Sequence, residues 1–310
     1  MGATDHIDRS PWRLGLDLGR SRLRGVVLDT DHRVVAQRQV ATPEHDYRSL
    51  IGLIAELVKS LETEVGQAEL PLGLAVPSGV SAASQRLRRG PMPLLNDRPL
   101  PADVSAATAR EVRTGHAAGC RALAEAADGS LAGFERVFVA SIGSSVSGAL
   151  LLDGRLAGGP NGTAGAWGHT SLPWPNNIES RAFPECWCGQ AGCIEAWVSG
   201  LGMSADHVRR GGHALTAEEI VERAEAGERL AGITLRDWLS RMARGLATLV
   251  NIVEPERIVV GGGLSRIRWL YSEVPKIWGQ YCLSDRVGTE IVPATHGETA
   301  AAFGAALLWP

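Results

Sequence analysis

Two stretches of this 310-residue chain contain the same order of short apolar runs and turns, and this repetition limits the folds that the chain can adopt. In the first stretch the apolar runs cover residues 12–19, 23–29 and 33–39. The second stretch repeats the order at residues 136–143, 148–153 and 155–157. Runs of this length between tight, Gly- or Ser-containing turns predict a three-stranded meander in each stretch. A duplication predicts two similar lobes, and ligands commonly bind between such lobes.

Helical and buried-strand patterns follow these meanders and indicate an α/β protein. Apolar residues recur at helical spacing over residues 47–65, and a buried strand is expected at residues 72–77. A second regular helix is expected at residues 235–253, ahead of a strand that begins at Arg257 and ends in three glycines. The Ala-rich tail, residues 298–308, favours a last helix. Residues 160–197 show no periodicity and are predicted to be a loop-rich, site-forming segment.

Composition and charge exclude several classes of protein. With 45% hydrophobic and 21% charged residues, the chain is expected to form globular domains rather than a disordered or fibrous structure. The 31 basic and 34 acidic residues give a net charge of −3, which argues against nucleic-acid or anionic-lipid binding. No apolar run approaches the ~18 residues of a membrane span, and the N-terminus is unlike a signal peptide. We therefore expect a cytoplasmic protein without membrane contact.

One histidine and three clustered cysteines have the spacing of a metal site. Cys186, Cys188 and Cys193 fall within eight residues, and His169 precedes them. Three thiolates and one imidazole complete the tetrahedral shell of Zn²⁺ and leave no open position, so the metal would be structural. The alternative is a group of unpaired cysteines in a reducing compartment, which the intervening glycines argue against because they supply the turns that converging ligands need.

Two glycine-containing turns have the character of phosphate-binding loops. Asp17 and Gly19 stand where the first strand gives way to the second, where a carboxylate could hold Mg²⁺ through water and a glycine could let backbone N–H groups approach a phosphate. Gly261, Gly262 and Gly263 offer a similarly close approach. An ordinary hairpin turn and a tight-packing turn are the alternatives.

The motif C-x-C-G-x-x-G-C-x-E, from Cys186 to Glu195, resembles the signature of the ROK family of repressors, open reading frames and sugar kinases. The similarity extends from Leu14 to Leu308. It implies the actin-like ATPase/sugar-kinase fold, an α/β, ribonuclease H-like fold of two lobes with a structural zinc site. The N-terminal lobe would comprise residues 1–115, completed by a C-terminal helix at 297–310, and the C-terminal lobe residues 116–296.

The resemblance also assigns candidate site residues. ATP and a hexose would lie between the lobes. The nucleotide or phosphate residues would be Asp17, Gly19, Ser21, Gly143, Ser144, Gly261, Gly262 and Gly263. The resemblance also gives Glu195 and His169 as sugar-contacting residues, and His169, Cys186, Cys188 and Cys193 as metal ligands. Two further candidate ligand-binding residues come from the sequence itself: Trp167 lies in the loop-rich segment, and Arg20 is a cation that could bind an anion directly.

Several positions depart from the family pattern. Ala117 stands where family kinases carry the Asp that acts as general base, and Ala166 replaces a sugar-binding Glu. Arg20, Ser145 and Ser147 replace residues that let the backbone approach phosphate, so these changes count against ATP and Mg²⁺ as cofactors. Loss of a general base alone typically costs ~10²- to 10⁴-fold in rate.

These departures lead us to expect a pseudokinase that has left sugar phosphorylation behind. The protein would be a repurposed biosynthetic enzyme or a small-molecule binding protein for a modified sugar or an aromatic compound. The alternative is an active kinase of an unusual sugar or cyclitol with a relocated base, for which His116 is the candidate. A packed or surface histidine is the plainer interpretation of His116. Only about a dozen residues precede the first strand, too few for a DNA-binding domain, and we expect a homodimer.

Overall fold

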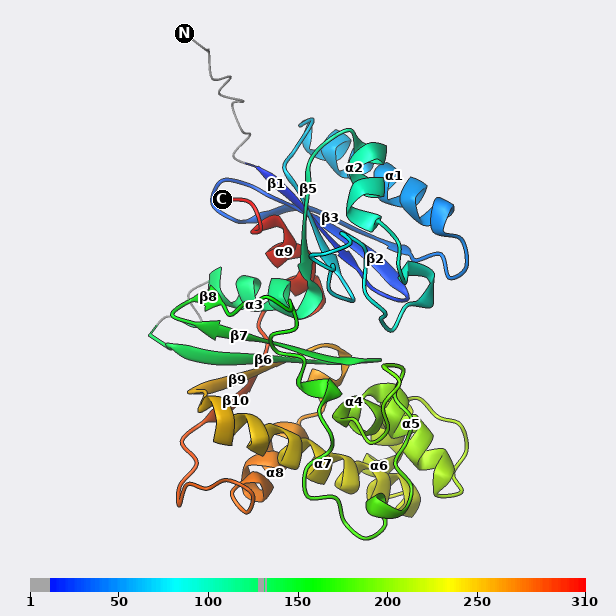
Figure 1. Cartoon of the computed structure of the whole chain (residues 1–310), viewed down its shortest axis with the longest axis vertical. Coiled ribbons are helices and arrows are strands. Elements are labelled where there is room, and N and C mark those ends of the chain that lie inside the picture. Colours follow the sequence, from blue (N-terminus) through cyan, green and yellow to red (C-terminus); the bar gives the residue numbers. More distant parts are fainter. Residues whose placement is uncertain (1–11, 128–130, 132) are drawn as a thin grey trace. The chain divides into compact units, whose positions relative to one another are not determined.

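The computed structural model describes residues 12–127, 131 and 133–310. These residues form two compact units (Figure 1). Of the described residues, the first unit contains those up to Ala127 together with 160–162 and 299–310, and the second unit contains those from 131 to 159 and from 163 to 298. The expected boundary after residue 115 therefore moves to the end of helix α3 (Ala117–Ala127). It moves because α3 packs against the C-terminal helix α9 (Ala300–Ala306) within the first unit.

The first unit contains one five-stranded mixed sheet with the order β3-β2-β1-β4-β5. Strands β1, β2 and β3 are antiparallel neighbours, whereas β4 and β5 run parallel to β1. The strands are β1 (Arg13–Leu18), β2 (Arg22–Leu28), β3 (Val34–Ala41), β4 (Leu72–Val76) and β5 (Val112–His116). The helices besides α3 and α9 are α1 (Tyr47–Val65) and α2 (Leu100–Thr108), with a 3-10 turn at Pro93–Leu95.

The second unit repeats this topology in the order β10-β9-β6-β7-β8. Strands β6, β7 and β8 form the antiparallel meander, and β9 and β10 extend the sheet in parallel with β6. The strands are β6 (Arg136–Ile142), β7 (Val146–Leu152), β8 (Arg155–Leu156), β9 (Arg257–Gly261) and β10 (Glu290–Pro293). The helices are α4 (Ile194–Val198), α5 (Gly200–Arg209), α6 (Ala217–Glu225), α7 (Arg229–Val253) and α8 (Trp269–Trp278). The predicted duplication is confirmed.

Alternation along β1 explains how the first sheet buries both of its faces. Leu14 and Leu16 are fully buried in the cluster that contains the apolar face of α1. Gly15 points to the other face, where a Cβ would lie 1.9 Å from the carbonyl oxygen of Ala302 in α9. The absence of a side chain at Gly15 therefore lets α9 lie directly on the sheet.

The core of the second unit forms around α7. One face of this helix buries Trp238, Met242 and Leu246 in the cluster that also contains Phe138 of β6 and Ile258 of β9. The helix begins at Arg229, six residues before the predicted start. The prediction missed these residues because the first turns of the helix lack the regular apolar stripe. Within the described residues, no helix combines the length and the apolar character that crossing a membrane requires.

Candidate functional site

The four predicted metal ligands come together in the second unit. His169 belongs to a 3-10 turn (Trp167–His169), and Cys193 directly precedes α4. The Sγ atoms of Cys186, Cys188 and Cys193 and a ring nitrogen of His169 all lie within 4.8 Å of one another. Cys186 Sγ is 3.7 Å from His169 Nδ1, and Cys188 Sγ is 3.6 Å from Cys193 Sγ. These separations match the edge of a tetrahedron with Zn–S bonds of about 2.3 Å and a Zn–N bond of about 2.1 Å.

Two isolated β-bridges, Ser171 with Cys193 and Glu185 with Ala191, hold the loop that carries these ligands. Gly192 sits between them with a φ of +77°, and a Cβ there would lie 2.7 Å from the ring of Phe183. A residue with a side chain would therefore strain the turn that delivers Cys193. Burial lowers the pKa of His169, which favours the neutral imidazole that binds metals.

Glu195 lies in the first turn of α4, only 4% exposed, two residues beyond Cys193. Its Oε2 accepts a 2.6 Å hydrogen bond from the backbone N–H of Val146, and its Oε1 accepts one of 3.2 Å from Trp187 Nε1. Burial raises the pKa of Glu195 to about 7, against the effect of these two hydrogen bonds. The carboxylate thus connects the metal-ligand loop to the start of β7.

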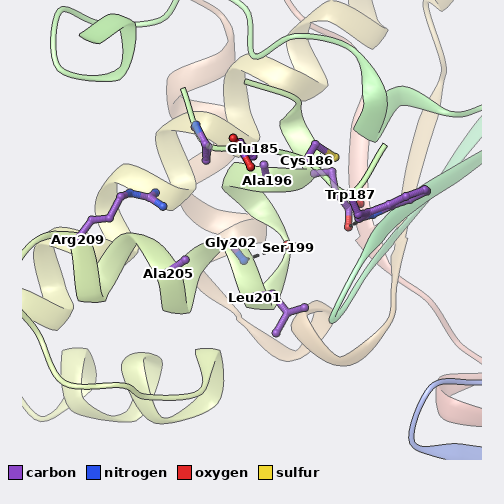
Figure 2. Close-up of a pocket in the computed structure, with 11 residues that line it drawn as sticks. Glu185, Cys186, Trp187, Ala196, Ser199, Leu201, Gly202, Ala205 and Arg209 are labelled. Carbon is purple, nitrogen blue, oxygen red and sulfur yellow. Dashed lines mark hydrogen bonds between the residues drawn. The ribbon is translucent and has the colours of Figure 1, made fainter. Parts of the chain in front are cut away.

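A cavity of about 400 Å³ opens beside Glu195 (Figure 2). Trp187 and Pro184 border it from the metal-ligand loop, and α5 contributes its other side. The residues around it are Pro184, Glu185, Cys186, Trp187, Glu195, Ala196, Ser199, Leu201, Gly202, Ala205 and Arg209. Most of these side chains are apolar or small, so the cavity suits a compact, largely apolar group.

Trp167 does not border this cavity. Its ring packs edge-on against Phe138 with the centroids 6.3 Å apart, and its Nε1 donates to the carbonyl of Ser147 at 3.1 Å. The side chain is 5% exposed and belongs to the main cluster of the second unit. The structure therefore places this candidate ligand-binding residue in the core, because a large indole fills the space between β6 and α7.

The candidate phosphate residues of the first unit cluster at the β1–β2 turn. Asp17 is 4% exposed, and its Oδ2 lies 3.9 Å from Nη2 of Arg121 on α3. Burial raises the pKa of Asp17, while Arg121 and Arg24 oppose that rise. The backbone N–H of Gly19 donates to the carbonyl of Arg22, and Ser21 accepts from the N–H of Thr42, so the turn is a closed hairpin.

Arg20 extends from the same turn and is exposed. It borders a second cavity of about 400 Å³ in the first unit, together with Pro43, Glu44, His45 and the segment 91–94. The guanidinium group that was predicted to bind a ligand, that of Arg20, therefore lies at a cavity.

The candidate phosphate residues of the second unit lie side by side at the ends of two neighbouring strands. Gly143 and Ser144 form the β6–β7 turn, and Gly261 ends β9, which pairs with β6. A Cβ at Gly143 would lie 3.7 Å from the backbone nitrogen of Gly263. The Gly143–Ser144 turn and the Gly261–Gly263 turn therefore lie next to each other.

His116 ends β5 directly before α3. Its Nδ1 accepts a hydrogen bond from the backbone N–H of Ala118 at 3.3 Å, the geometry of a helix N-cap. Burial lowers the pKa of His116, and a hydrogen bond to the carbonyl of Pro77 acts in the opposite direction. His116 thus caps α3 and contacts Pro77 as a neutral imidazole, as a structural histidine does.

A buried ionic network in the second unit escaped the sequence analysis. Glu179 accepts hydrogen bonds from Arg241 Nε and Arg244 Nη2, each at 2.8 Å, and Arg241 also donates to Asp206 at 2.8 Å. All four side chains are nearly fully buried. In the sequence, this network is indicated by a pair of arginines, three residues apart, that interrupts the apolar stripe of α7. The network anchors the segment before the cysteines to α5 and α7.

The ROK family profile matches residues 13–310, and the chain belongs to this family. It is 31% identical to an N-acetyl-D-glucosamine kinase of Vibrio parahaemolyticus over 95% of this chain and 98% of that relative. The crystal structure of a ROK hexokinase from Thermus thermophilus superposes with a TM-score of 0.81 at 26% identity, covering 96% of this chain and 97% of the hexokinase. A ROK glucokinase from Streptomyces griseus, solved with glucose and AMPPNP, gives a TM-score of 0.81 at 22% identity over 96% and 98% of the two chains. The predicted two-lobed sugar-kinase fold is confirmed.

These relatives correct the functional prediction. We expected a pseudokinase, either a binding protein or a repurposed enzyme, because of Ala117, Ala166 and the altered loops. That expectation is wrong, since relatives that align over nearly their whole length are sugar kinases. The substitutions at these few positions suggested a combined loss of activity, whereas the similarity over nearly the full length favours an active kinase.

Proposed function

We propose that this chain is an ATP-dependent sugar kinase whose substrate is an N-acetylated hexosamine. The observation that carries the proposal is the full-length similarity to N-acetyl-D-glucosamine kinases at 31% identity. Relatives in this family are kinases of different sugars. The choice of an N-acetylated hexosamine as the substrate is therefore tested on a panel of sugars.

Two groups of residues support the nucleotide part of the proposal. Asp17 lies buried at the end of β1, where a carboxylate would hold Mg²⁺ through water. Gly143 and Gly263 lie next to each other at the ends of neighbouring strands, where small residues leave room for phosphate oxygens beside backbone N–H groups. Serines at positions 144 and 145 add hydroxyl donors to this turn.

Glu195 supports the sugar part of the proposal. It is a buried carboxylate with two N–H donors, next to a cavity, and sugar hydroxyls are good partners for such a group. The resemblance assigns sugar contacts to Glu195 and His169, and the structure brings both residues to the metal-ligand loop.

We further propose that this family member transfers phosphate without a side-chain base at position 117. Ala117 is the first residue of α3, and its methyl group cannot accept a proton. Phosphoryl transfer depends mainly on positioning and electrostatic stabilisation, so the reaction would continue at a rate reduced by ~10²- to 10⁴-fold.

The cluster of His169, Cys186, Cys188 and Cys193 would bind Zn²⁺ as a structural ion. Its ligand set and separations fit four-coordinate zinc with no position left for substrate. The metal would fix the loop that carries Trp187 and precedes Glu195, and thereby the shape of the adjoining cavity.

A coupled assay of ADP release tests the proposal with N-acetylglucosamine, N-acetylmannosamine, glucose and mannose. We expect saturable, sugar-dependent turnover that is highest with an N-acetylated sugar. The matched variant is Glu195→Ala, which should raise the KM for sugar far more than the KM for ATP. Equal turnover with and without sugar, or a preference for the unsubstituted hexoses, would contradict the proposal.

A further inference from the structure

The cavity beside Glu195 is larger than an acetyl group requires. Its volume is about 400 Å³, whereas a water molecule occupies about 30 Å³ of the liquid. An acetyl group has only three heavy atoms, so it would leave most of this space open.

Trp187 forms the aromatic wall of the cavity and fixes its position relative to Glu195. The indole donates from Nε1 to Glu195 Oε1 and packs edge-on against His169, with ring centroids 4.5 Å apart. It is held by two neighbours and yet remains 36% exposed. Figure 2 shows Trp187 at one end of the cavity and Arg209 at the other.

The opposite wall of the cavity is a face of α5 with small residues at its centre and an arginine that is already paired with a carboxylate. Gly202 and Ala205 lie on it, and the exposed side chain of Leu201 borders it. Arg209 is engaged by the carboxylate of Asp206 at 3.0 Å and stacks over Trp197. An apolar chain therefore matches this wall better than a second polar sugar or an anionic group.

We propose that this cavity holds the acyl group of an N-acylated amino sugar and accepts acyl chains longer than acetyl. The inference rests on the proposed function, because the sugar bound at Glu195 presents the acyl group. Trp187 is then the specificity-determining residue, since its ring packs against the first carbons of the chain while its N–H holds the carboxylate.

A series of N-acylglucosamines tests the inference, from formyl through acetyl, propanoyl and butanoyl to hexanoyl. The kcat/KM should rise by about fourfold for each added methylene until the cavity is filled, because each buried CH₂ contributes a transfer free energy of that size. Calorimetric binding of the same series, in the absence of ATP, gives a second readout that does not depend on turnover.

Ala205→Phe fills the cavity from an exposed helix position, so folding should be preserved. We expect this variant to lose the gain from longer chains, so that its kcat/KM stays flat from acetyl to hexanoyl. Ala226→Phe, at an exposed position away from the cavity, is the control and should behave as wild type.

Binding and kcat/KM that stay flat or fall beyond acetyl would overturn the inference, and so would an Ala205→Phe variant that retains the gain. Either result leaves turnover of N-acetylglucosamine, and with it the proposed kinase, intact. Binding that increases with chain length but without phosphoryl transfer would instead support the cavity and contradict the kinase.

Discussion

Ala117 is the residue that most affects the rate expected of the proposed kinase. Ala117 begins α3, directly after His116 has used its Nδ1 to cap the helix. The backbone at this point is a regular helix start, where an aspartate is favoured by the free N–H groups and the helix dipole. A carboxylate at position 117 therefore requires no change in the fold.

We expect Ala117→Asp to raise kcat by about 10²- to 10⁴-fold, the usual contribution of a general base. The rate constant at saturating ATP and sugar measures the effect, and melting temperature should change little. Ala127→Asp, at the other end of α3, makes the same substitution away from that position and should leave kcat unchanged. No rise in Ala117→Asp would show that this residue does not limit the rate.

Glu179 is the second residue whose removal has a defined consequence. Burial alone would raise the pKa of Glu179, but hydrogen bonds from Arg244 and Arg241 lower it below its ordinary value. Glu179→Gln would leave the buried guanidinium of Arg244 without a carboxylate partner and Arg241 with Asp206 alone, and it should cost about 3–5 kcal/mol of unfolding free energy. Glu222→Gln, at an exposed site on α6, is the control.

The pH dependence follows from the sign of this shift. A carboxylate with a lowered folded-state pKa stabilises the protein fully above its unfolded pKa of about 4.5, and the effect is lost as pH falls through the folded value. The stability difference between wild type and Glu179→Gln should therefore be constant from pH 5 to 8 and shrink below about pH 4.5. Urea titrations at several pH values measure it, and a difference that grows toward acid pH would contradict the assignment.

At the scale of elements, we expect the loop between β8 and α4 to depend on a bound zinc ion. Two isolated bridges and short 3-10 turns are the regular structure of this segment, so the cluster of four ligands supplies much of its order. Cys188→Ser should lower the melting temperature by at least about 5 °C, because each kcal/mol is worth about 2–4 °C in a domain of this size. Cys282→Ser, outside the cluster, is the control.

Metal analysis of the purified wild-type chain should find one zinc per chain, and Cys188→Ser should have less. Removal of zinc by a chelator should lower the melting temperature of the wild type toward that of the variant. A wild type without zinc, or a chelator without effect, would remove the metal from this account.

The elements that the sequence predicted correctly are those with a local pattern. The alternation of Leu14 and Leu16 marks a strand, and the spacing of Cys186, Cys188 and Cys193 marks a ligand loop, because each signal lies within a few residues. Glu179 and Arg241 are 62 residues apart, and their pairing depends on how α7 packs against the loop. No local spacing carries that information, and the same holds for the burial of Trp167.

At the scale of the whole molecule, one topology occurs twice, and the family identity favours a kinase that the individual substitutions did not predict. The duplicated sheets place the candidate phosphate residues at equivalent positions, Gly19 after the first strand of one unit and Gly143 after the first strand of the other. The predicted homodimer stays a prediction, for which light scattering should give twice the mass of one chain.

Identification of the product is the most direct test of the central claim, that this chain phosphorylates an N-acetylated hexosamine. Incubation with ATP, Mg²⁺ and N-acetylglucosamine should give a sugar monophosphate by mass spectrometry and ³¹P resonance, in equal amount to the ADP formed. ADP that accumulates with inorganic phosphate and without a sugar phosphate, or ATP that stays intact with every sugar of the panel, would contradict the claim.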